Sequence, residues 1–94
     1  MRIVWTAPAL SDLQALRAYI ARDQPSAAAQ QVENILAAIG GLVRFPESGR
    51  PGRRTGIREL VIGRTPYIVA YCSRGEAIQV LRVLNGRQRW PSAP

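Results

Sequence analysis

The sequence predicts an α+β domain in which a helical hairpin packs on one face of a small, twisted, mostly antiparallel sheet. Two observations lead to this prediction. Apolar residues recur at helical spacing in the first half of the chain, whereas the second half holds three short apolar runs separated by hairpin-length breaks. The length of 94 residues suits a single domain over residues 1–94. The expected order is therefore β-α-α-β-β-β.

The N-terminal half is expected to form one strand and two helices. Residues 3–5 are β-prone, and Thr6 offers a hydroxyl cap for a helix over about residues 7–22. Pro25 suits the first turn of a second helix, which weakens at residues 40–41. The apolar positions of the two helices are Leu10, Leu13, Leu16 and Ile20, then Ala28, Val32, Ile35, Leu36 and Ile39.

A basic loop opens the C-terminal half. Residues 49–56, called here the basic loop, hold three arginines and three glycines, and this composition predicts no regular structure. Three strands should follow, at residues 57–62, 67–72 and 77–84.

These strands are more apolar than a sheet with one wet face requires. Strict alternation in the last strand would place Leu81 and Val83 on one face, and Ile78, Val80 and Leu84 on the other. Since two helices cover one face only, we expect the second face either to curl on itself or to bind a segment of another chain. We favour the bound segment, because large exposed apolar patches usually mark interaction sites.

The charge of the chain is unevenly distributed. All 13 basic residues are arginine, and the chain contains no histidine. Residues 1–43 carry as many acids as arginines, so the net charge of +7 lies entirely in residues 44–94. This positive half predicts an anionic partner. The absence of histidine and lysine removes the two usual proton carriers near neutral pH.

Two arginines of the predicted strands, Arg58 and Arg82, are placed among apolar neighbours. Each needs either an acidic partner within the chain or an anionic ligand. Because Cys72 is the single cysteine of the sequence, an internal disulfide and a cysteine-based zinc site are excluded. Cys72 lies in an apolar run and is expected to be a buried thiol. We expect no metal and no cofactor.

No stretch of the sequence reaches the roughly 18 apolar residues of a membrane span. The N-terminus also lacks the apolar region of a signal peptide. A cytoplasmic protein is therefore expected.

Several short pieces of the sequence resemble the RelE/ParE superfamily of type II toxins. They are Trp5-Thr6, Asp12-Leu13, Tyr19-Ile20, Phe45-Pro46 and Gly49-Arg50, and more closely residues 56–61, 66–71 and 81–84. The likeness covers about residues 3–91, and its specificity lies in the order and spacing of the pieces. Within the superfamily the chain is most similar to the ParE-like, plasmid stabilisation branch.

The resemblance implies a RelE/ParE-like fold and a cognate antitoxin in a toxin–antitoxin hetero-oligomer. The antitoxin would wrap the toxin with an acidic C-terminal segment, which suits a chain of charge +7. The residues expected to bind it are the apolar positions Leu13, Leu16, Ile20, Ile78, Val80 and Leu84.

The resemblance implies two alternative targets. RelE-like members cut mRNA on the ribosome, with sites built from lysine, arginine, histidine or glutamate and a C-terminal tyrosine, whereas ParE-like members poison DNA gyrase. Here Arg58 and Arg82 match the strand arginines, but Asn85 stands where related toxins often have histidine, and the terminal aromatic is Trp90. Because the acid/base set is incomplete, we favour a non-enzymatic gyrase inhibitor. A ribosome-dependent mRNA endoribonuclease remains the alternative, with Arg58, Arg82 and Tyr71 as its catalytic residues.

The resemblance places target contacts in the segment that follows the last strand. Tryptophan and arginine are typical of interface hot spots. The expected target-binding residues are Arg58, Arg82, Asn85, Arg87, Arg89 and Trp90. Other interpretations stay open for these residues: Trp90 could pack as a core plug, and Arg87 and Arg89 could form a solvated tail. For the whole protein, the alternatives are a nucleic-acid-binding module without toxicity and a toxin that has lost its activity.

Overall fold

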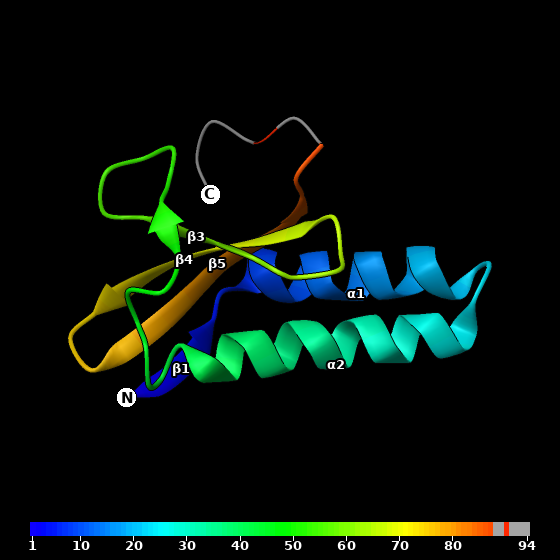
Figure 1. Cartoon of the computed structure of the whole chain (residues 1–94), viewed down its shortest axis with the longest axis horizontal. Helices are drawn as coiled ribbons and strands as arrows, with labels where there is room; N and C mark the ends of the chain where they lie inside the picture. Colours follow the sequence, from blue (N-terminus) through cyan, green and yellow to red (C-terminus); the bar gives the residue numbers. More distant parts are fainter. Residues whose placement is uncertain (88–89, 91–94) are drawn as a thin grey trace.

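The computed structural model describes residues 1–87 and Trp90, and it confirms the expected α+β class. The two helices lie side by side against one face of the sheet (Figure 1). The described elements are β1 (Arg2–Trp5), α1 (Ala7–Ala21), α2 (Pro25–Gly41), β2 (Arg50–Pro51), β3 (Arg58–Val61), β4 (Tyr67–Arg74) and β5 (Ala77–Asn85).

Both helices begin at the residues that the sequence indicates. The hydroxyl of Thr6 caps α1 by accepting a hydrogen bond from the backbone N–H of Ala9 at 3.2 Å. Proline occupies the first turn of each helix, where its missing N–H costs nothing. None of the described helices is long and apolar enough to cross a membrane.

The five described strands form one mixed sheet in the order β1-β5-β4-β3-β2. The β1–β5 pair is parallel and the other pairs are antiparallel. The long connection that a parallel pair requires consists here of the helical hairpin followed by β2, β3 and β4. The expected absence of regular structure in the basic loop is wrong at its start, because Arg50 and Pro51 pair as β2 with Glu59 and Arg58.

A bulge in β5 overturns the strict alternation expected for the last strand. Tyr71 pairs with Val80 and Ala70 pairs with Arg82, which leaves Leu81 without a partner residue in β4. An extra residue reverses the facing of every position beyond it. Val83 therefore packs in the same core as Val80, contrary to the expected grouping of Val80 with Leu84.

The main core lies between the helices and one face of the sheet. It joins helix residues to the inward side chains of β4 and β5, and Tyr71 is its largest fully buried member. Its members are Ala9, Leu16, Ile35, Ile39, Leu42, Ile62, Tyr67, Val69, Tyr71, Ile78, Val80 and Val83.

The second face of the sheet is largely covered by the chain itself. Ile68, Ala70 and Leu84, which lie outside the main core, are 7%, 0% and 3% exposed. In Figure 1 the helices lie below β3 and the right-hand ends of β4 and β5, and the chain between β2 and β3 lies above these strands. The expectation that this face holds a segment of another chain is thus wrong for these residues, because they are already buried within this chain. Cys72, expected to be buried, is only partly so, and its thiol donates to Gln79 at 3.5 Å.

Candidate functional site

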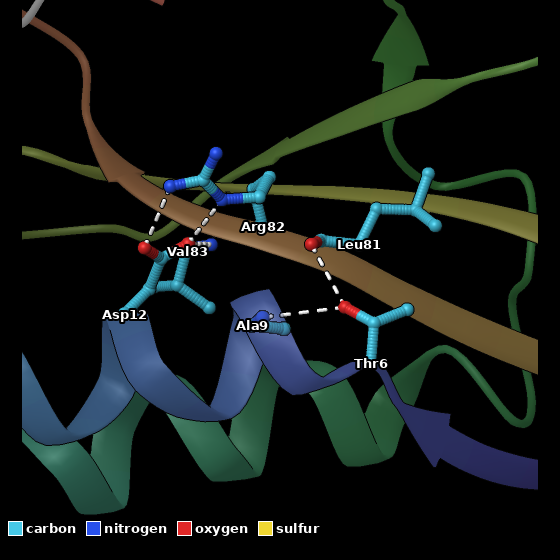
Figure 2. A network of polar contacts seen from close by, with 6 residues as sticks. All are labelled: Thr6, Ala9, Asp12, Leu81, Arg82 and Val83. Atoms are coloured by element: carbon cyan, nitrogen blue, oxygen red, sulfur yellow. Dashed lines mark hydrogen bonds and ion pairs between the residues drawn. The ribbon is translucent and has the colours of Figure 1, made fainter. Parts of the chain in front are cut away.

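An ion pair joins the first helix to the last strand (Figure 2). Asp12 on α1 accepts hydrogen bonds from Nε of Arg82 at 2.7 Å and from Nη2 of the same residue at 2.8 Å. Its Oδ2 also accepts from the backbone N–H of Val83 at 3.0 Å. The hydrogen bond to Asp12 raises the pKa of Arg82, although burial opposes it. Arg82 therefore has an acidic partner within the chain.

The start of α1 closes an edge of β5 that β1 leaves open. The β1–β5 pairing ends at Val80, whose carbonyl also accepts from the backbone N–H of Thr6 at 3.1 Å. The hydroxyl of Thr6 donates to the carbonyl of Leu81 at 3.0 Å, and Asp12 then takes the N–H of Val83 (Figure 2). Hydrogen bonds from Thr6 and Asp12 thus take the place of those that a neighbouring strand would form with this edge of β5.

Tyr71 anchors the segment between α2 and β2. Its side chain is fully buried, and its hydroxyl donates to the carbonyl of Pro46 at 2.8 Å and accepts from the N–H of Gly49 at 2.9 Å. A Cβ atom at Gly49 would lie only 2.7 Å from the tyrosine ring, so the backbone approaches the ring closely there.

Arg58 holds the same segment from β3. It pairs with Tyr71 across the β3–β4 ladder, and its Nη1 donates to the carbonyl of Gly49 at 2.8 Å and of Glu47 at 3.3 Å. The structure therefore brings together two of the three candidate catalytic residues, Arg58 and Tyr71. Both fasten a loop, while the third, Arg82, is held by Asp12.

Glu59 organises the basic loop, a role that the sequence did not single out. The residue is 3% exposed. One carboxylate oxygen contacts Arg50 at 3.2 Å, and the other accepts from the backbone N–H of Arg53 at 3.0 Å and lies 3.6 Å from its Nε. The one feature of the sequence that could have indicated this role is that Glu59, on the strand after the basic loop, is the first acid to follow the three arginines of the loop.

The tail meets the basic loop through Trp90. The guanidinium carbon of Arg53 lies 4.1 Å from the centre of the Trp90 ring, which is a cation–π contact. Among the described residues, the buried indole nitrogen of Trp90 has no hydrogen-bond partner. Asn85 is partly buried, and its side-chain oxygen accepts from the N–H of the exposed Arg87 at 2.9 Å. Arg89 lies outside the described residues.

Four of the six residues expected to bind the antitoxin are buried within the chain. Leu16, Ile78, Val80 and Leu84 are 7%, 0%, 0% and 3% exposed, because the bulged strand and the helices pack on them. Leu13 and Ile20 keep part of their surface. The large hydrophobic side chains exposed in the described chain are Met1, Val4, Leu10, Tyr19, Leu36, Val43, Phe45 and Val61.

A hollow of about 380 Å³ lies between α1 and the ends of β4 and β5. Burial raises the pKa of Tyr67, one of its lining residues, and the neighbouring Tyr19 raises it further. The lining residues are Asp12, Ala15, Leu16, Tyr19, Tyr67, Val83, Leu84 and Asn85. Within the part of the chain that the structure describes, no group of three or more histidine, cysteine or acidic residues could hold a metal ion.

Comparison with known proteins places the chain in a family. The family model described as the ParE toxin of type II toxin-antitoxin system, parDE, matches residues 3–90. Protein Y4kP of Sinorhizobium fredii, which carries a provisional toxin name, is 43% identical over 90 residues, covering 96% of this chain and 93% of that protein. Toxin RelE2 of Caulobacter vibrioides is 35% identical over 82 residues, covering 87% of this chain and 91% of that protein.

A solved structure shares the fold. It is described as the chromosomal ParDE TA system from P. aeruginosa, and it superposes with a TM-score of 0.83 at 30% identity, covering 90% of this chain and 95% of the other. The matched helices, the mixed sheet and the family model agree over nearly the whole chain. The chain belongs to the ParE family of toxins of type II toxin–antitoxin systems.

Proposed function

We propose that this toxin arrests growth by poisoning DNA gyrase, and that a cognate antitoxin neutralises it. The toxin would act by binding rather than by catalysis, through the segment that follows β5. This proposal extends the family assignment to a particular target.

The observation that carries the proposal is the engagement of all three candidate catalytic residues. Tyr71 is fully buried with its hydroxyl bound on both sides, Arg58 binds two backbone carbonyls, and Arg82 is paired with Asp12. A ribonuclease would need such groups to move protons and to stabilise a developing phosphorane. Their engagement favours a toxin that works through its surface.

The exposed part of the tail supplies such a surface. Arg87 is exposed after β5, and Trp90 is held against Arg53 at 4.1 Å. An aromatic ring held in place loses less conformational freedom on binding than a mobile one. Trp90 and Arg87 are therefore the described residues that we expect to contribute most to target binding.

The antitoxin surface is proposed on the helices. Leu10 and Leu36 are 46% and 45% exposed, and Tyr19 is 69% exposed beside the hollow that ends at Asn85. Apolar side chains in this number on one short domain favour a protein partner. The printed description of the P. aeruginosa structure names a toxin–antitoxin system, which supports a partner of the same kind here.

The alternative target is mRNA on the ribosome. The Caulobacter vibrioides relative carries the name RelE2, which is the observation that keeps this alternative in view. It predicts codon-dependent mRNA cuts and leaves gyrase activity unaffected.

The test adds the purified chain, freed of antitoxin, to purified gyrase with plasmid DNA. We expect loss of supercoiling and accumulation of linear DNA. Trp90→Ala and Arg87→Gln should relieve both effects, whereas Arg17→Gln, an exposed arginine on α1, should not. Normal gyrase activity at concentrations that arrest growth, together with cut mRNA on ribosomes, would overturn the proposal in favour of the alternative.

A further inference from the structure

We propose that the basic loop binds the phosphate backbone of duplex DNA through the guanidinium groups of Arg50, Arg53 and Arg54. The recognition of phosphate is argued from the loop itself. The choice of DNA as the source of phosphate rests on the gyrase function proposed above.

The basic loop has a defined backbone rather than an extended one. The N–H of Gly52 donates to the carbonyl of Ile57 at 2.7 Å, and the N–H of Ile57 donates to the carbonyl of Arg54 at 3.2 Å. A Cβ atom at Gly52 would lie 2.5 Å from the oxygen of Ile57, and Gly56 has a φ of 84°, so glycine is required at both positions. A closed turn presents its arginines with less loss of entropy on binding than a flexible segment would.

The charges of the loop are arranged with the acid inside and the cations outside. Glu59 is 3% exposed, yet the side chains of Arg50 and Arg53 that contact it are 55% and 50% exposed. Arg54 is exposed as well. Each guanidinium group has five N–H donors, so the single carboxylate of Glu59 cannot accept hydrogen bonds from all the donors of both Arg50 and Arg53. Donors therefore remain on the solvent side for phosphate oxygens.

The surface of the loop suits a polyanion better than a protein. An open hollow of about 420 Å³ is lined by residues 51–58. Of the large hydrophobic side chains exposed in the described chain, none lies in residues 49–59. Protein interfaces usually centre on apolar and aromatic residues, whereas surfaces that bind nucleic acids are polar and positively charged. This pattern favours phosphate over an acidic peptide.

The position of the loop keeps it accessible when the helices are covered. The helices lie on one side of the sheet, and the chain between β2 and β3 lies on the other (Figure 1). An antitoxin on Leu10 and Leu36 would leave the loop open. Trp90, stacked on Arg53, borders the same surface, so that DNA bound by the loop would lie beside the proposed target-binding tail.

The test is fluorescence anisotropy of a labelled 20-base-pair duplex with the chain alone, at several NaCl concentrations and without gyrase. Three phosphate contacts predict a slope of log K against log [NaCl] of about −2.7. Arg54→Gln should make this slope shallower by about 0.9 and weaken binding several-fold at about 0.1 M salt. Arg17→Gln removes the same charge from α1 and should leave the slope unchanged.

Circular dichroism should show that both variants are folded. Equal slopes for Arg54→Gln and Arg17→Gln would overturn the proposal, because they would show that binding follows net charge rather than the loop. Tighter binding of a labelled acidic decapeptide would overturn it in favour of a protein partner. Tighter binding of single-stranded RNA of the same length would overturn the choice of DNA. Because gyrase is absent, each result stands apart from the outcome of the supercoiling test.

Discussion

The carboxylate of Asp12 forms a bidentate ion pair with the guanidinium of Arg82, although the two residues lie 70 positions apart in the chain. The same carboxylate takes the N–H of Val83 (Figure 2). One acid therefore neutralises an arginine among apolar neighbours and closes a strand edge.

Asp12→Ala should lower the free energy of unfolding by about 2–3 kcal/mol, because it leaves a largely buried guanidinium and a backbone N–H without their acceptor. The side chains of Arg82 and Asp12 are only 21% and 13% exposed, so water compensates the loss in part. Urea unfolding measures the change. Asp23→Ala, which removes an exposed acid between the helices, is the matched control. If Asp12→Ala and Asp23→Ala lower the free energy of unfolding by amounts that agree within about 0.5 kcal/mol, the role assigned to Asp12 is contradicted.

Adding Arg82→Met to Asp12→Ala tests the pair directly. Once the buried cation is gone, the loss of its acceptor should cost less, and the two substitutions should be non-additive by about 1 kcal/mol or more. Additive effects in the same urea experiments would mean that the contact contributes little.

Tyr71→Phe should cost about 1–2 kcal/mol of stability, because the N–H of Gly49 and the carbonyl of Pro46 both lose their buried partner. Growth arrest should persist as long as the chain remains folded. Tyr19→Phe, at a position 69% exposed, should change neither stability nor toxicity. Abolished toxicity with unchanged stability would instead indicate the catalytic role that the ribonuclease alternative assigns to Tyr71.

Glu59→Gln should loosen the contact between the basic loop and Trp90. The amide keeps the shape of the side chain but loses the charge that holds Arg50 and Arg53. In a Trp5→Phe background Trp90 is the only tryptophan of the chain, and its emission should move to longer wavelength with stronger quenching by acrylamide. Glu76→Gln, at an exposed position, is the control and should leave the emission unchanged. Identical spectra for the two variants would show that Glu59 does not position the tail.

The stability of the protein should fall at alkaline pH through Tyr67. Burial, and secondarily Tyr19, raises the pKa of Tyr67 in the folded state. The unfolded chain therefore releases this proton first, near pH 10, and the free energy of unfolding falls as pH rises from there through the folded pKa. Tyr67→Phe should flatten this fall above about pH 10, whereas Tyr19→Phe should preserve most of it. Parallel profiles for the native chain and Tyr67→Phe would contradict the assignment.

The amino-acid sequence was sufficient to predict the order of the elements, the two helices, the principal strands and the positive C-terminal half. These features depend on local periodicity, capping residues and composition, which can be read within a window of a few turns. The cap at Thr6 and the start of α2 at Pro25 are confirmed for that reason. The sequence also singled out Arg58 and Arg82 as charges that need partners.

The contacts of those two arginines and the exposure of the apolar residues depend instead on the three-dimensional packing of the chain. Asp12 meets Arg82 across 70 positions, a pairing that no local pattern encodes. The bulge at Leu81 reverses the facing of Val83 and Leu84, and the register of two strands is fixed by their packing rather than by either strand alone. The contacts of Glu59 with Arg50 and Arg53 likewise depend on how the basic loop folds back onto β3, because the energy of such contacts depends on three-dimensional proximity.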